Sequence, residues 1–448
     1  MELRESPLWQ EISAIAFEGP VPSAYSWKAT FTAGGKEIVP FKVISVMIFR
    51  DYRNNFGDEI ELEVMIPAGT FVYDLYPHRN NLKVSLQREG RLNESDSPLL
   101  SPDIEAQQMR ATLVDDFSVA VEGARSSAHS RESLNLSEVM NVKFQLIDLA
   151  LDNVRLHSVG GLFRDTTVGD CLKYILTSIA NDIELDDNNK ILGVEMVEPA
   201  NTDTYKHIVL HSGTRLPDVP QILQKKVGGL YPTGMGAYLY RQHWYVFPLY
   251  DLTRFDKTVK TLTLINVPTN QMPNVERTYR TTANQVIALV TGDVKHLDRS
   301  EAVQQNEGNG VRYLDARRVI DGFADTSEGE NKAKVMRADN NNEFSVEQRA
   351  DGMNNVMTTQ ITANKFAEMS KLAQRLGSEI QCIWENSHIG AVYPGMPVKF
   401  MYIKNDTIKE LKGVVLGVQH YVQTHGVGVT ESRHRTDTTL HLFVEREK

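Results

Sequence analysis

Two histidines, His207 and His211, stand four residues apart, the spacing that places two zinc ligands on one face of a helix. They lie in the stretch Tyr-Lys-His-Ile-Val-Leu-His, whose alternation of apolar residues is typical of a strand instead. In a strand, residues four apart are separated by about 13 Å. No acidic residue lies between the two histidines, so we expect two surface histidines and no metal site.

Further histidines occur late in the chain, each without a second ligand at the spacing of a zinc or iron site. We interpret them as hydrogen-bonded strand and loop residues. Histidines that gather on a three-fold axis can also bind a metal ion, and that alternative stays open. The residues are His388, His420, His425, His434 and His441.

Motifs of calcium and nucleotide sites are incomplete. Asp186–Asn189 and Asp339–Glu343 begin like calcium loops but lack the glycine and the closing glutamate that such loops need. Gly234-x-Gly236 and Gly426-x-Gly428 lack the third glycine of a dinucleotide site, and no Walker phosphate loop occurs. All four stretches are predicted to be turns.

The sequence contains no complete motif for nucleophilic catalysis either. No Gly-x-Ser-x-Gly elbow occurs. Cys171 lies in an apolar helical pattern and Cys382 in an alternating strand pattern, so we expect inert core thiols in a chain that folds in a reducing cytoplasm. The sequence thus predicts no catalytic, cofactor-binding or metal-binding residue and no cofactor.

A hydrolase that uses two carboxylates stays open, because 58 acidic residues guarantee that some lie close together. A sugar cleft would also need exposed aromatic platforms, and the chain has four tryptophans. Trp244, in an expected hairpin, and Trp384, in an alternating strand, are predicted to be core residues instead.

Composition narrows the class of protein. The chain has 448 residues, enough for two to four domains, with 41% hydrophobic and 24% charged residues. The net charge of −10 argues against specific nucleic-acid binding, which needs basic patches. The sequence has neither a secretory signal pattern nor an apolar run long enough to span a membrane, so we expect no membrane span.

Residues 25–152 contain several short runs in which apolar and polar positions alternate, as in strands with one buried face. Turn residues separate the runs, so the segment predicts a first antiparallel β-barrel. Residues 1–24, with three prolines, are expected to be an N-terminal lead-in. The expected strands are 42–50, 59–66, 82–88, 110–122 and 141–152.

Residues 153–255 change to helical spacing and predict a small α+β domain. Apolar residues recur at helical intervals over Val168–Ile179, and Thr167 is placed to cap that helix. A second helix is expected from about Asp218, with Gly228-Gly229 as its C-terminal stop. Two strands around Arg241-Gln242 are expected to form a hairpin.

Residues 256–448 return to strands and predict a second β-barrel. Within them, 296–355 is polar and rich in Asn and Gly, which predicts a loop or an arm that orders on assembly. Thr362 is placed to cap a helix. The expected strands are 258–267, 379–385, 396–403, 412–423 and 436–445.

In Ile389–Ile403 a Pro394-Gly395 turn stands directly before an apolar run. The next run carries Gly413 and Gly417, which permit bulges in a strongly curved sheet. Gly229–Asp251 is a second stretch of interest. In the order barrel, α+β domain, barrel, these stretches resemble the baseplate hub proteins of contractile-tailed bacteriophages, the T-even-like and Mu-like hub family.

The resemblance implies an α+β chain that is mostly β, with two tube-like antiparallel β-barrel domains flanking a small α+β domain. It implies a structural homotrimer of the virion tail baseplate, assembled in the host cytoplasm, and not an enzyme. The trimer would adapt the six-fold tail tube to the three-fold central spike and let DNA pass. Its partners would be the tail tube protein, the central spike protein and neighbouring baseplate wedge proteins.

Two other functions stay open at the level of sequence. The first is another tail-tip component, or a baseplate component that binds a receptor or glycan. The second is a tail-associated peptidoglycan hydrolase.

Overall fold

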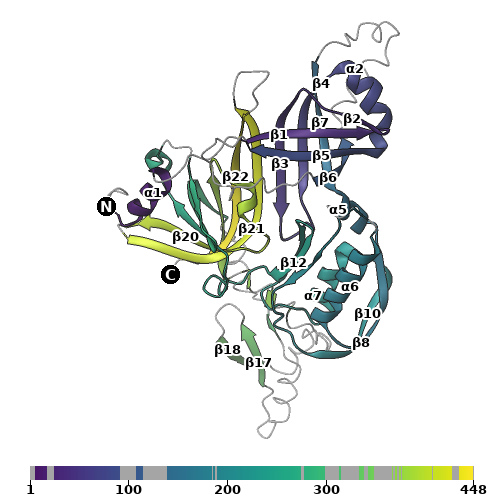
Figure 1. The fold of residues 1–448 in the computed structure, drawn as a ribbon. Coiled ribbons are helices and arrows are strands. Elements are labelled where there is room, and N and C mark those ends of the chain that lie inside the picture. Colours follow the sequence, from purple (N-terminus) through teal and green to yellow (C-terminus); the bar gives the residue numbers. More distant parts are fainter. Residues whose placement is uncertain are drawn as a thin grey trace.

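The computed structural model contains two β-barrels joined along shared strands, with a smaller α+β domain beside them (Figure 1). The expected fold class, mostly β with two barrels and a small α+β domain, is confirmed. The structure describes residues 6–17, 25–90, 107–114, 139–183, 185–186, 189–273, 277–297, 312–313, 332–337, 342–347, 366, 369–370, 373–374, 376–405, 407–425 and 433–446.

Barrel one is built mainly from the first part of the chain. Its strands follow one another in the order β3, β4, β7, β6, β5 and β1, and the ring is closed by β22 and β21. The short strand β2 (Lys36–Ile38) pairs with β1, and a helical segment at 68–81 packs Phe71 and Leu75 into the barrel core. The strands are β1 (Tyr25–Ala33), β3 (Lys42–Asp51), β4 (Glu59–Pro67), β5 (Leu82–Gly90), β6 (Gln107–Leu113) and β7 (Val139–Asp148), and the helical segment consists of α2 (Ala68–Thr70), η2 (Phe71–Leu75) and η3 (Tyr76–Asn81).

Barrel two is built from the last part of the chain. Its ring runs β13, β20, β21, β22, β19 and β15 and returns to β13. Strand β14 extends the sheet from β15. The elements are β13 (Thr261–Asn266), η6 (Thr269–Gln271), β14 (Tyr279–Thr281), β15 (Gln285–Leu297), β19 (Gly377–Trp384), η9 (Ile389–Ala391), β20 (Pro397–Lys404), β21 (Thr407–His425) and β22 (Arg433–Glu445).

The long strands β21 and β22 belong to both barrels. Residues 407–414 of β21 pair with β20 of barrel two, whereas residues 417–423 pair with β3 of barrel one. The β21–β22 register shifts between Val415 and Gly417, so a bulge marks the point where β21 changes its partner. The glycines expected to permit bulges in a curved sheet therefore lie at the junction of the barrels.

Barrel two departs from an all-antiparallel ring at β13, which pairs in parallel with both β15 and β20. Parallel strands are usually covered on both faces, and β13 is buried almost throughout. Its outer side is covered by helix α1 (Leu8–Phe17), which packs Leu8, Ile12 and Ile15 against Ile265 and its neighbours. The segment expected only as a lead-in thus carries a helix that covers barrel two.

The α+β domain has two small sheets around the helices α6 and α7, and the short helix α5 leads into it. The ribbon β8–β10 covers α6, and the three-stranded sheet β11–β12–β9 packs on the same core. Its elements are α5 (Leu149–Val154), β8 (Ser158–Thr167), α6 (Val168–Asp182), β9 (Gly193–Met196), β10 (Thr204–Arg215), η5 (Leu216–Asp218), α7 (Val219–Lys226), β11 (Met235–Tyr240) and β12 (His243–Pro248).

Local signals in this domain behave as expected. The Thr167 hydroxyl accepts a hydrogen bond from the Asp170 amide at 3.0 Å and caps α6. Gly228 and Gly229 follow α7 with positive φ angles, as a helix end requires. Arg241 and Gln242 have φ of 47° and 64°, the left-handed pair that a two-residue hairpin turn needs.

Several expectations lie wholly or partly outside the described residues. These include the expected cap at Thr362 and the turn at Gly426-x-Gly428. Within 296–355 the described strands are β16 (Arg312–Tyr313), β17 (Lys332–Arg337) and β18 (Asn342–Glu347), which form a small sheet. No described helix is long and apolar enough to cross a membrane. The domain boundaries at 25, 153 and 256 stay predictions.

A substitution at Gly413 tests how far stability depends on the shared hairpin, which consists of strands β21 and β22. A Cβ atom there would lie 2.8 Å from the Val444 Cα and closer still to the Phe443 carbonyl of the neighbouring strand. We expect Gly413→Ala to lower the free energy of unfolding by about 2 kcal/mol or more, because a backbone atom cannot move aside as a side chain can. Urea unfolding followed by tryptophan fluorescence measures this effect.

Gly161→Ala is the matched control, because the nearest atom to its added Cβ is a Phe163 ring carbon at 3.9 Å. It should change the same free energy by less than about 1 kcal/mol. Equal effects of the two substitutions would show that close approach at the junction is not what limits stability.

Candidate functional site

A buried arginine lies where the two barrels and the α+β domain meet. Arg50, on β3, is 4% exposed, and its Nε and Nη2 donate to Asp58 Oδ2 at 2.9 and 2.8 Å. The Asp58 carboxylate also accepts a hydrogen bond from the Tyr238 hydroxyl of β11 at 3.0 Å. The guanidinium lies 4.8 Å from the centre of the Tyr240 ring. Asp58 therefore pairs with Arg50 within barrel one and links it to the α+β domain through the charge-assisted bond from Tyr238.

The electrostatics of this pair favour the ionised state. Burial alone would lower the pKa of Arg50, but Asp58 and the nearby tyrosines raise it well above its ordinary value. Burial and then the charge of Asp58 raise the pKa of Tyr238, which stays protonated and donates to that carboxylate. Arg50 is thus a fixed positive charge inside the protein.

His420 extends the cluster along the shared hairpin. Its Nε2 lies 3.2 Å from Arg50 Nη1, and its Nδ1 lies 2.7 Å from the Thr438 hydroxyl on β22. Nε2 must accept from the guanidinium, so Nδ1 carries the proton. His420 is fully buried, and burial, Arg50, His388 and Arg88 lower its pKa well below the ordinary value. The imidazole is therefore neutral in the fold.

The hydrogen-bonded interpretation is also confirmed for the other late histidines that are buried, His388 and His434. His388 Nε2 lies 3.2 Å from Arg88 Nη2 of β5. His434 accepts from the Trp27 amide at 3.3 Å and faces the Val43 carbonyl at 3.1 Å, which joins β22 to barrel one.

His441 is part of a strand face, and burial first and Arg53 second lower its pKa. The side chain of His425 is outside the description.

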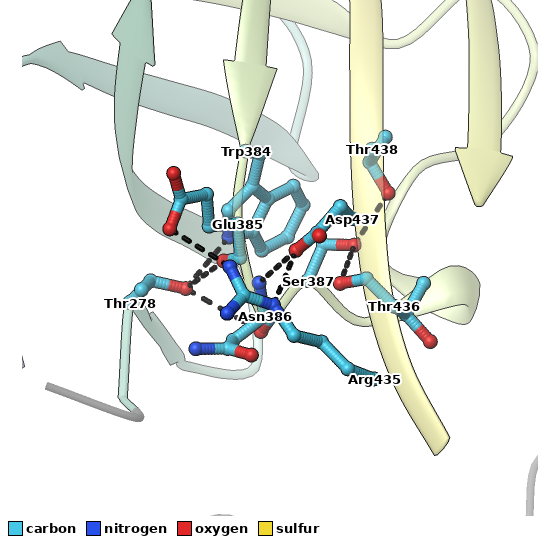
Figure 2. A network of polar contacts seen from close by, with 9 residues as sticks. All are labelled: Thr278, Trp384, Glu385, Asn386, Ser387, Arg435, Thr436, Asp437 and Thr438. Atoms are coloured by element: carbon cyan, nitrogen blue, oxygen red, sulfur yellow. Dashed lines mark hydrogen bonds and ion pairs between the residues drawn. The ribbon is translucent and has the colours of Figure 1, made fainter. Parts of the chain in front are cut away.

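A second polar network closes the end of barrel two near the hairpin (Figure 2). The Trp384 indole donates to the Thr278 hydroxyl at 3.0 Å, and that hydroxyl donates to the Glu385 carbonyl at 2.6 Å. Arg435 on β22 donates to Glu385 at 2.8 Å and to Asp437 at 2.9 Å. The network fixes the loop after β19 against both β22 and the strand preceding β15.

The polar cluster around Arg50 and His420 is poorly suited to hold a metal ion. His388 and His420 come together, but their charged neighbours are Arg88 and Arg50, which repel a cation. No group of three His, Cys, Asp or Glu in the described part of the chain could hold a metal ion. His207 and His211 are exposed on strand β10, so the expected surface placement is confirmed.

The described groups give little support to acid–base or thiol chemistry. Burial raises the pKa of Cys171 and of Cys382 to about 12, which leaves little thiolate at neutral pH. Burial alone would raise the pKa of Asp51, but hydrogen bonds from the Arg53 amide, Asn54 and the Arg53 guanidinium outweigh it and lower that pKa. A glycosidase acid needs the opposite shift.

Trp244 and Trp384 are 1% and 0% exposed, so neither forms a sugar platform, and the core placement expected for both is confirmed.

Sequence reasoning missed Arg50, Asp58 and Arg88 as members of the junction. Arg50 and Arg88 each end an alternating apolar run, which reads as the solvated end of a strand. The signal that could have found Arg50 is its place in the inward-facing series of β3, in register with the apolar positions Val46 and Ile48.

Comparison with known proteins yields only distant similarities. No protein-family model matches the chain, and no curated protein matches it. A tail protein from Neisseria meningitidis MC58 is 12% identical, with a TM-score of 0.41 over 93% of this chain and 96% of that one. The 43 kDa tail protein of prophage MuSo2 from Shewanella oneidensis is 10% identical, with a TM-score of 0.44 over 92% and 98%.

A third similar structure is the c3393 protein, a type VI secretion system component from E. coli described as similar to the T4 bacteriophage tail proteins gp27 and gp5. It is 9% identical, with a TM-score of 0.40 over 93% of this chain and 77% of that one. At these values the comparisons do not assign a function.

Asp58→Asn tests the buried ion pair. The change leaves the Arg50 charge buried without its carboxylate, so we expect the free energy of unfolding to fall by about 3–5 kcal/mol. The matched control is Asp218→Asn, whose partner Arg215 is 71% exposed. That change should lower the same free energy by less than about 1 kcal/mol. Urea unfolding of both variants measures the difference, and similar small losses would contradict the role assigned to Asp58.

The lowered pKa of His420 predicts that the stability of the fold depends on pH. In the unfolded chain the pKa of this histidine is about 6.5. In the folded chain it is lower, so the folded chain takes up this proton only at a lower pH. Stability is therefore fully present above about pH 6.5 and falls as the pH drops below it, by up to about 1.4 kcal/mol per pH unit. His441 contributes with the same sign.

Urea unfolding between about pH 7.5 and pH 5.5 measures this slope in the unmodified chain and in His420→Gln. The variant removes one titrating group, so its slope should be shallower whatever its absolute stability. Identical slopes would show that His420 does not control the acid response.

Proposed function

We propose that this protein is a structural baseplate hub of a contractile phage tail, a homotrimer that adapts a six-fold tail tube to a three-fold spike. The observation that carries the proposal is the pair of closed β-barrels fused through one hairpin, β21–β22. A barrel closes its own strand edges and is stable as a tube-like building block. Two such blocks held rigidly in one chain are what a change from three-fold to six-fold symmetry requires.

The adaptation follows from counting barrels. A trimer of chains with two barrels each presents six barrels around its axis. It presents three copies of the α+β domain. The six barrels face the tail tube, and the remaining three-fold features face the spike. The fusion through one hairpin fixes the angle between the barrels, so the spacing of the six does not depend on a flexible linker.

The β8–β10 ribbon offers a surface for contact between subunits. It forms a separate two-stranded sheet in the described part of the chain, so the outer edges of both strands remain unpaired there. On its solvent side, Leu162 and Val209 lie directly opposite each other and are 48% and 56% exposed. An apolar pair beside open strand edges is stabilised when another subunit covers it.

The passage of DNA needs a surface that does not bind phosphates. Along the solvent side of β4, Glu59, Glu61 and Glu63 form an acidic row, with Lys143 opposite the last of them on β7. An acidic surface repels the DNA backbone and keeps it mobile. An acid-lined passage through the trimer is part of the proposal.

The mass of the purified chain in solution tests the assembly. We expect a species of three chains of 50.5 kDa each, measured by light scattering coupled to gel filtration, because barrel closure leaves the apolar ribbon for subunit contact. Binding of the trimer to tail tube protein from the same phage is measured in the same way. A monomer that binds neither tube nor spike protein would overturn the proposal.

Two variants and one assay sharpen the result. Val209→Lys places a charge in the ribbon and should shift the mass toward the monomer, whereas Val39→Lys, at a valine that is 65% exposed in barrel one, should not. Clearing of peptidoglycan by the unmodified chain would favour the hydrolase alternative instead. Binding to host cells by an isolated monomer would favour the receptor-binding alternative.

A further inference from the structure

A wide groove separates the three-stranded sheet of the α+β domain from barrel two. Its volume is about 1280 Å³, and it is lined by β9, β12, the loop at 251–260, the turn before β15 and the segment before β20. A small-molecule site usually has about 300–1,000 Å³ and a mostly apolar lining. This groove is larger and is bounded by charged segments from distant parts of the chain, which suits an elongated ligand.

Tyrosines form the middle of the groove. Tyr245 on β12 lies with its ring centre 6.4 Å from that of Tyr393 and 6.2 Å from that of Tyr240. The Tyr393 hydroxyl donates to the Lys260 carbonyl at 2.8 Å, which holds its ring in place. On the rim, Val259 is 70% exposed. The groove therefore offers apolar and aromatic surface already fixed in position.

Charges of both signs line the groove, and three cations gather on one loop. Glu195 and Glu198 come from β9 and the residues after it, whereas the loop before β13 carries Arg254, Lys257 and Lys260 and one acid, Asp251. Within the described residues, none of these three cations has a carboxylate within ion-pair distance. Arg254 is half-buried, burial lowers its pKa, and its Nη1 donates to the Gly395 carbonyl at 2.8 Å. Its position is therefore fixed, and Asp251 offsets its charge only in part, because the pKa of Arg254 stays below its ordinary value.

We propose that this groove binds an extended acidic segment of a partner polypeptide. Side chains of an extended segment alternate in direction, so carboxylates on one face reach the loop cations while the other face meets Tyr245, Tyr393 and the β9 side. The site does not depend on trimer formation, so it can be tested independently of the hub proposal.

A peptide fits these observations better than a glycan does. Sugars stack on broad aromatic faces, whereas the Tyr245 ring contacts the rings of both Tyr240 and Tyr393. A neutral glycan would also leave Lys257 and Lys260 without a carboxylate partner. An acidic segment supplies such partners, and it must bind against the net charge of −10 of the whole chain. Binding of such a probe therefore reports a local site and not general attraction.

The experiment uses the full chain and a fluorescein-labelled copolymer of glutamate and tyrosine as the probe, with binding followed by fluorescence anisotropy. Lys257→Gln combined with Lys260→Gln should weaken binding by about tenfold, as two lost charge-assisted contacts predict. Both lysines are exposed, so the variant should fold. Lys173→Gln combined with Lys206→Gln changes the net charge equally at exposed sites outside the groove and should weaken binding by less than about twofold.

Chemical acetylation of lysines, read by mass spectrometry, locates the probe on the unmodified protein. Lys257 and Lys260 should be protected when the copolymer is bound, and Lys173 and Lys206 should not. Equal weakening by the two double variants, no binding to the unmodified chain, or protection away from the groove would overturn the proposal. Protection of the groove by a hexamer of N-acetylglucosamine, without binding of the copolymer, would replace the peptide by a glycan.

Discussion

The shared hairpin is the constraint on which the rest of the structure depends. Strand β21 leaves β20 and joins β3 at one bulge, so neither barrel can close unless the hairpin is in place. Gly413 and Gly417 allow the neighbouring backbones to approach closely at this point. The orientation of the barrels is therefore set by backbone hydrogen bonds and close packing, which makes the pair a rigid unit suited to a symmetric assembly.

The buried charges reinforce this junction. An ion pair such as Arg50–Asp58 loses much of its hydration on burial, so it adds little stability compared with an apolar pair of the same size. What it adds is a strong penalty for any arrangement in which one partner is left alone. Because Asp58 also binds Tyr238, and His420 joins Arg50 to the hairpin, the penalty applies to barrel one, the α+β domain and the hairpin together.

The groove and the junction lie on the same three-stranded sheet. Tyr238, Tyr240 and Tyr245 share one face of this sheet, where Tyr238 binds Asp58, Tyr245 lines the groove and Tyr240 contacts both Arg50 and Tyr245. A polypeptide bound in the groove would therefore rest on a wall that the buried ion pair holds still.

The sequence by itself determined most of the elements, because apolar alternation and helical spacing are local signals. It predicted β3, β4, β20 and α6 closely, as well as the turn at Arg241-Gln242, whose residues fix the backbone locally. Helix α1 was missed although Leu8, Ile12 and Ile15 have helical spacing. Only the tertiary structure decided that β13 is parallel to its neighbours, that one hairpin closes two barrels, and that Arg50 meets both Asp58 and His420. The closing of both barrels and the meeting of Arg50 with His420 depend on residues hundreds of positions apart, and no local pattern records which strands will meet.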